Sequence, residues 1–191
     1  MNKKNNQRVK LTIRLLQESL IKLLKDNSLY DITITELCQE AEINRSTFYK
    51  YYNSIRGLYE ELEQMALRRS AECLESMDLR SESAVVSRIE ALLVHIRENS
   101  ELYTLLFANS AGDDFTYRLI MQTTGFVELF PEVIPEDKRN NAEYCSLFVT
   151  AGALSIIMSW LRNGAEDEPS ELASLIFGLA ADALSFSTAE A

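Results

Sequence analysis

Apolar side chains recur along this chain at intervals of three and four residues, the spacing that gathers them on one face of an α-helix. Helix breakers are sparse, because only six Gly and three Pro occur in 191 residues. The pattern therefore predicts an all-α fold. Beyond a pair of short helices described next, the expected helices cover residues 9–25, 55–74, 84–98, 101–108, 115–130, 141–162 and 169–186.

Two short helices separated by a tight turn are expected between residues 33 and 52. Either Thr33 or Thr35 can cap the first helix, because a threonine hydroxyl accepts a hydrogen bond from a free amide of the first turn. Asn44 ends the turn and can cap the second helix in the same way, so that this helix begins at Arg45. The layout is that of a helix-turn-helix, whose second helix lies in the major groove of DNA.

The second short helix has an apolar face and a polar face. Phe48 and Tyr52, four residues apart, point inward, and the outward positions carry hydroxyl and cationic groups suited to base edges and phosphates. Tyr51 can alternatively serve packing, and Thr33 can be a helix cap alone. The expected DNA contacts come from Thr33, Thr35, Asn44, Arg45, Ser46, Thr47, Tyr49, Lys50, Tyr51 and Arg56.

Residues 33–59 resemble the DNA-binding segment of the TetR/AcrR family of bacterial transcriptional regulators. The resemblance implies that a brief loop follows the helix pair and leads into a long fourth helix, which joins the DNA-binding domain to a helical C-terminal domain. The positions that carry it are Thr33, Leu37, Cys38, Ala41, Ile43, Thr47, Phe48, Tyr49 and Tyr52.

Three residues depart from the family pattern. Glu42 replaces the usual Gly of the turn, and would carry a strain of order 1 kcal/mol if its φ is positive. Tyr51 stands where His is frequent, and Ile55 stands where a Lys is common. Because Ile55 cannot bind phosphate, Arg56 is the expected substitute for that contact.

Charge is distributed unevenly along the chain, whose formal net charge is −10. Up to Arg56 there are ten basic and six acidic side chains, a net charge of +4, which leaves −14 for the remainder. Such asymmetry is expected when one end of a protein meets phosphates and the other faces solvent. Residues 1–10 are mostly polar and are expected to be disordered, with basic groups that serve either solubility or contacts with the DNA backbone.

Length and composition limit the other possibilities. We expect a DNA-binding domain at residues 1–54 and a regulatory and dimerisation domain at residues 55–191. The longest apolar stretch, residues 150–161, is too short to span a bilayer, so a cytoplasmic protein is expected. The three Cys are expected to be buried reduced thiols. One His, no phosphate-binding loop and no metal-ligand cluster favour a protein that is not an enzyme and uses no cofactor or metal.

Residues 141–162 have apolar positions on two sides of the expected helix, so two surfaces must cover it. The resemblance implies that the last two helices form a four-helix bundle with a second subunit; the alternative is that both sides face the core of one subunit. A symmetric pair would place two recognition helices about 34 to 36 Å apart on a near-palindromic operator. The expected dimerisation residues are Val149, Gly152, Ala153, Ile156, Trp160, Leu172, Ile176, Leu179 and Ala183.

The resemblance also implies a cavity in the C-terminal domain that takes an apolar or aromatic effector and thereby reorients the fourth helix. Each candidate residue can equally belong to the ordinary core, and the single His can be a hydrogen-bonded structural residue. The candidates are His95, Tyr103, Phe107, Tyr117, Met121, Phe126, Tyr144 and Phe148.

These patterns predict a sequence-specific, DNA-binding transcriptional regulator. The resemblance implies that it acts as a homodimeric repressor under the control of a small molecule or a protein partner. Residues 147–179 also resemble a subgroup related to a regulator of dihydroxyacetone kinase genes, in which a protein coactivator can be the partner, so an activator is the alternative. A helical protein–protein adaptor is a second alternative, which Glu42, Ile55 and the acidic balance favour.

Overall fold

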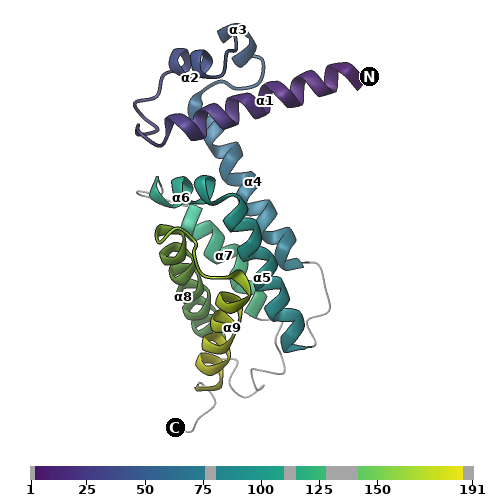
Figure 1. Ribbon diagram of the computed structural model, residues 1–191, viewed down its shortest axis with the longest axis vertical. Helices are drawn as coiled ribbons and strands as arrows, with labels where there is room; N and C mark the ends of the chain where they lie inside the picture. Colours follow the sequence, from purple (N-terminus) through teal and green to yellow (C-terminus); the bar gives the residue numbers. More distant parts are fainter. Residues whose placement is uncertain (1–2, 76–80, 110–114, 128–141, 187–191) are drawn as a thin grey trace. The chain divides into compact units, whose positions relative to one another are not determined.

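The structure is a computed structural model that describes residues 3–75, 81–109, 115–127 and 142–186 (Figure 1). Within these ranges every regular element is a helix, which confirms the predicted all-α fold. The helices are α1 (Lys3–Leu23), α2 (Ile34–Glu40), α3 (Arg45–Phe48), α4 (Ile55–Glu75), α5 (Glu82–Glu98), α6 (Ser100–Ala108), α7 (Phe115–Val127), α8 (Ala142–Arg162) and α9 (Pro169–Phe186).

The chain divides into two compact units, Met1–Ala66 and Leu67–Ala191, which we call unit 1 and unit 2. This division lies within α4, whereas the domain boundary predicted from the sequence lies at the first residue of that helix. The physical reason is that the first half of α4 contributes buried side chains to unit 1. The most buried residues of unit 1, each at most 2% exposed, are Leu16, Leu20, Leu37, Phe48, Leu58, Tyr59, Leu62 and Ala66.

Helix α1 begins at Lys3, well before the predicted start at residue 9, so most of the N-terminal segment expected to be disordered is helical. Once a helix is nucleated, each further residue adds a hydrogen bond, and the run of Asn, Gln and basic residues before Val9 contains no Gly or Pro to stop it. The apolar pattern therefore located the buried part of α1 but not its first turns.

In unit 2, α5 packs along α9, and α8 packs against α6, α7 and α9. The turn between α8 and α9 follows the predicted signals. Gly164 has a φ of +82° and Ala165 a φ of +54°, and the amide of Ala165 donates to the carbonyl of Trp160 at 2.9 Å, which ends α8. Pro169 is the first residue of α9, where its missing N–H costs no helical hydrogen bond.

Candidate nucleic-acid interface

A capping box fixes the start of α2. The Thr33 hydroxyl oxygen accepts a hydrogen bond from the Glu36 amide at 3.2 Å, and the Thr33 amide donates to Glu36 Oε2 at 2.8 Å. The Thr33 hydroxyl also donates to the same carboxylate oxygen at 2.7 Å, and these bonds lower the pKa of Glu36. Of the two predicted caps, Thr33 is the residue used, and Thr35 is exposed in the first turn.

The turn between α2 and α3 contains Glu42 with a φ of +52°, the strained conformation that replacement of Gly was predicted to impose. The amide of Ile43 donates to the carbonyl of Cys38 at 2.9 Å, which closes the turn. Asn44 then caps α3, because its Oδ1 accepts a hydrogen bond from the Ser46 amide at 3.0 Å. The predicted start of the second helix at Arg45 is confirmed.

Helix α3 is short, but hydrogen-bonded turns continue it to Tyr52, whose amide donates to the carbonyl of Phe48 at 3.0 Å. We call residues 45–52 the recognition segment. Phe48 is fully buried and Tyr52 is 8% exposed, so both point inward as predicted. Arg45, Ser46, Tyr49 and Lys50 are exposed, whereas Thr47 and Tyr51 are partly buried.

Tyr52 also makes a contact that sequence analysis missed. Its hydroxyl donates to Glu61 Oε2, in the second turn of α4, at 2.5 Å. Burial, together with the hydrogen bond and negative charge of Glu61, raises the pKa of the Tyr52 hydroxyl, which stays protonated as a donor. The end of the recognition segment is thereby tied to α4. No local sequence pattern predicts this pair, because only the packing of the segment on α4 brings the two side chains together.

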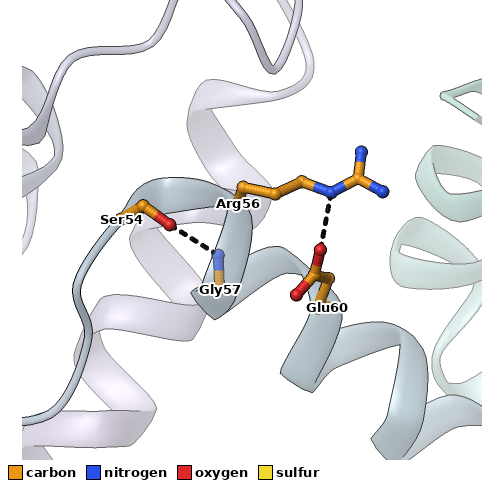
Figure 2. Close-up of polar contacts among 4 residues, drawn as sticks. All are labelled: Ser54, Arg56, Gly57 and Glu60. Carbon is orange, nitrogen blue, oxygen red and sulfur yellow. Dashed lines mark hydrogen bonds and ion pairs between the residues drawn. The ribbon is translucent and has the colours of Figure 1, made fainter.

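Figure 2 shows the first turns of α4, where Ser54 caps the helix by accepting a hydrogen bond from the Gly57 amide at 3.1 Å. Arg56, the predicted phosphate contact, is exposed, but its Nε donates to Glu60 Oε1 at 2.9 Å. That hydrogen bond raises the pKa of the guanidinium. Ile55 is 8% exposed and belongs to the core. Glu60 is thus a second residue that the sequence analysis did not single out.

An ion pair joins the first two helices of unit 1. Lys22, in the last turn of α1, donates a hydrogen bond to Glu40 at the end of α2, and this bond raises the pKa of the Lys22 ammonium group. The pair is largely exposed, so its contribution to stability is small. The pair links α2 to α1 at the end of α2 from which the turn toward α3 begins.

The predicted effector residues fall into two groups in unit 2. His95, Tyr103 and Phe107 lie together, with ring centroids 5.8 Å apart between His95 and Tyr103 and 6.3 Å apart between Tyr103 and Phe107. The Tyr103 hydroxyl is 3.1 Å from Ser70 Oγ, and Phe115 completes this aromatic cluster. The other candidates are exposed, namely Tyr117 (59%), Met121 (50%), Tyr144 (72%) and Phe148 (71%), and the side chain of Phe126 lies outside the described residues.

The predicted dimerisation residues also divide. Trp160, Leu172 and Ile176 are buried within a single chain, and the Trp160 indole donates to the carbonyl of Asp167 at 3.1 Å. These three residues are therefore part of the chain's own core. Val149, Ala153, Ile156 and Ala183 are partly buried, and Gly152 is exposed. The apolar residues that α8 and α9 leave exposed are Tyr144, Leu147, Phe148, Leu175 and Leu179, which we call the exposed apolar face.

Helix α8 is also apolar over a greater length than expected. Residues Tyr144–Arg162 have a mean hydropathy of 1.6 and are long enough to cross a membrane, with 28% of the most apolar stretch buried. This corrects the expectation that the apolar stretch is too short. Length and composition alone do not distinguish such a helix from one that another protein surface covers.

A helix-turn-helix unit followed by a second unit that is helical throughout its described residues is the architecture of a helical transcriptional regulator. Residues 87–182, half of the chain, match a TetR-type family described as a transcriptional regulator C-terminal region. The chain belongs to the TetR family of transcriptional regulators.

Among curated proteins, the chain is 20% identical over 168 residues to the uncharacterized HTH-type transcriptional regulator YxbF of Bacillus subtilis (strain 168). The match covers 86% of this chain and 43% of that relative, so the chain spans less than half of the relative's length.

Three solved structures have similar folds. A tetR-family transcriptional regulator from Streptomyces coelicolor has a TM-score of 0.67 and 18% identity, over 99% of this chain and 84% of that one. The dihydroxyacetone kinase operon activator DhaS has a TM-score of 0.62 and 19% identity, over 92% and 97% of the two chains. The TetR family repressor AlkX from Dietzia sp. has a TM-score of 0.52 and 17% identity, over 90% and 94%.

Proposed function

We propose that this chain is a sequence-specific DNA-binding repressor that recognises a near-palindromic operator as a homodimer. The observation that carries the proposal is the recognition segment, in which Phe48 and Tyr52 are buried while Arg45, Ser46 and Lys50 face solvent. The Ser46 hydroxyl also donates to Asn44 Oδ1 at 3.2 Å, whereas the side chains of Arg45 and Lys50 form no hydrogen bond or ion pair among the described residues of unit 1. A helix held by its apolar side, with donors and cations on its other side, suits insertion into a major groove.

The polar residues proposed to contact DNA divide by the chemistry that they offer. Arg45 and Thr47, at the start of the segment, supply hydrogen bonds to base edges, and Lys50 and Arg56 supply positive charge to phosphates. Asn44 and Thr33 use oxygens to cap helices, so their contribution to DNA binding is chiefly to hold the backbone in place. Because phosphate contacts release counterions, we expect affinity to fall steeply as salt rises.

Substitutions within the segment test these roles. We expect Lys50→Ala to weaken binding to all duplexes to a similar extent, whereas Arg45→Ala and Thr47→Ala change sequence preference by roughly 1–3 kcal/mol. Gel-shift titration on operator and random duplexes measures both effects, with Arg162→Ala, an exposed cation of unit 2, as the control. Unchanged binding in all three segment variants would remove the recognition segment from the proposal.

The operator itself is found by selecting bound fragments from random duplex DNA with the full-length chain. A homodimer is expected to enrich two inverted half-sites whose centres lie about one helical turn apart or a multiple of it. Failure to enrich any sequence, with the protein folded, would favour the alternative of a helical protein–protein adaptor.

The exposed apolar face supports the homodimer. Tyr144 and Phe148 on α8, and Leu175 and Leu179 on α9, are all more than half exposed, and helices α8 and α9 pack against each other. A side chain placed at Gly152 would meet nothing within 4 Å, so the backbone of α8 is open to close approach at this position. A second subunit would cover this face, so α8 would not have to be covered by a lipid bilayer. The proposed location is the cytoplasm, where the DNA lies.

We further propose that unit 2 controls DNA affinity through a small molecule or protein partner, with α4 as the helix that both units share. A second candidate function, a coactivator-dependent activator, is favoured by the similar fold of a solved dihydroxyacetone kinase operon activator. A reporter placed behind the selected operator distinguishes the two. Deleting the regulator raises expression if it is a repressor and lowers expression if it is an activator.

A further inference from the structure

Unit 2 contains a buried cation that belongs neither to the recognition segment nor to the exposed apolar face. Arg88, in the middle of α5, is 6% exposed. Val85, three residues earlier on the same side of the helix, is 3% exposed, so Arg88 lies on a buried side of α5 beside an apolar residue. Burying an arginine is unfavourable unless a negative group or several acceptors compensate its charge.

Only part of the Arg88 guanidinium has a hydrogen-bond partner in the described part of the chain. Its Nη1 donates to the carbonyl of Leu74 in the last turn of α4. Its Nε and Nη2 are buried, and the structure shows no hydrogen-bond acceptor for either of them among the residues that it describes. These two nitrogens form one edge of the planar guanidinium, and their N–H groups are nearly parallel. That edge is the one with which arginine grips two oxygens of a single anion.

From this geometry we infer that Arg88 is the anchor of a binding site for the carboxylate group of a small molecule. A carboxylate presents two coplanar oxygens to the two free donors and carries the single negative charge that Arg88 balances. A phosphate group, with a charge of about −1.5 to −2, would leave excess negative charge in the same buried position. The remainder of the ligand would meet apolar side chains such as Val85.

This site gives a chemical class to the effector, and in that respect it rests on the proposed control of DNA affinity by unit 2. The link is the bond from Arg88 to Leu74. Because the same guanidinium that would hold the carboxylate also holds a carbonyl of α4, a change in its position on binding acts directly on that helix. The effector of this regulator would therefore be an organic acid rather than a neutral apolar compound.

Thermal unfolding of the full-length protein without DNA tests the site, so its result does not depend on whether the operator proposal holds. Sodium acetate and sodium benzoate are the probes, compared with sodium chloride and sodium phosphate at equal ionic strength. We expect a saturable rise in Tm, about 3 to 5 °C at a carboxylate concentration near ten times its Kd, that chloride and phosphate do not produce. No rise specific to carboxylate, or a rise with phosphate alone, would overturn the inference.

Variants locate the effect. Arg88→Met removes the charge with little change of volume, and we expect the carboxylate-dependent rise in Tm to be lost. Arg88→Lys keeps the charge but lacks the two-donor edge, so we expect carboxylate binding to weaken at least tenfold. Arg97→Gln is the matched control, because it removes an arginine of the same helix whose partner is Glu168, and it should respond as the unmodified chain does. If Arg88→Met fails to fold, Arg88→Lys carries the test. A full response in the Arg88 variants would refute the site.

Discussion

At the level of single residues, the groups of unit 1 that we propose to contact DNA are not all equally available. Thr33 both accepts from and donates to groups of Glu36, and Arg56 donates to Glu60. A contact between Arg56 and a DNA phosphate would compete with this exposed ion pair. The stronger the ion pair, the less Arg56 would contribute to the free energy of DNA binding. A residue chosen from sequence for its charge can thus be restrained by a neighbour one turn away.

Replacement of Glu60 by Gln tests this competition. We expect DNA affinity to increase by a factor of about 1.4 to 5 at low salt, since an exposed pair of this kind is worth about 0.2–1 kcal/mol. Glu72→Gln is the matched control, because Glu72 pairs with Arg69 at 2.7 Å on the same helix and has a similar exposure. Fluorescence anisotropy with a labelled operator measures both variants, and equal affinities would show that Glu60 does not restrain Arg56.

His95 makes stability depend on pH. Burial, and then the charge of Arg69, lower the pKa of its imidazole below the ordinary 6.5. The unfolded chain therefore takes up the proton first as pH falls, so stability is complete above pH 6.5 and declines below it. Glu36, whose pKa lies below 4.5, adds a similar loss only at lower pH.

We therefore expect His95→Gln to reduce the difference in Tm between about pH 7.5 and pH 5.5. Differential scanning calorimetry at the two pH values measures the effect, and no second His exists in the chain to obscure it. If the variant loses as much stability on acidification as the original chain, another group is responsible.

At the level of elements, local signals located helix ends well. Thr33, Asn44 and Pro169 act within one turn of their own position, and each stands at the helix start that the sequence indicated. The strained φ of Glu42 is local in the same sense. Contacts that depend on how helices pack, such as Tyr52 with Glu61 or Arg88 with Leu74, involve residues nine or more positions apart and have no such signal.

The apolar pattern of α8 shows the same limit. Both of its sides carry large apolar residues, so periodicity alone predicts that both are covered but not which side faces the chain's own core. The structure places Trp160 inside, held by Asp167, and Phe148 outside. The exposed apolar face consequently includes Leu147 of α8 and Leu175 of α9, which the sequence analysis did not select.

Relief of strain in the turn of unit 1 gives a prediction for this element. Glu42→Gly is expected to stabilise the chain by up to about 1 kcal/mol, because a positive φ costs glycine little, although its freedom in the unfolded chain offsets part of the gain. Urea unfolding measures the change. Glu42→Gln, which removes the same charge but keeps the strain, should show no such gain, and equal stability of the two variants would exclude strain as the cause.

At the level of the whole molecule, the exposed apolar face determines the state of assembly that we propose. Phe148→Asp is expected to reduce the solution mass from two subunits to one at micromolar concentration, because a buried carboxylate in an apolar interface lacks a partner. Analytical ultracentrifugation gives the mass. Tyr30→Asp, at a residue of unit 1 that is 88% exposed, is the control and should leave the mass unchanged, and a Phe148→Asp protein of undiminished mass would place the interface elsewhere.

The large apolar side chains that α8 and α9 leave uncovered also bear on how gene expression would respond to the amount of regulator in a cell. Below the concentration at which subunits associate, the number of DNA-competent pairs rises with the square of the number of chains. Halving synthesis would then cut operator occupancy about fourfold while most of the operator is unbound. Expression from a promoter under such control would change over a narrower range of regulator concentration than expression from a promoter bound by a single subunit.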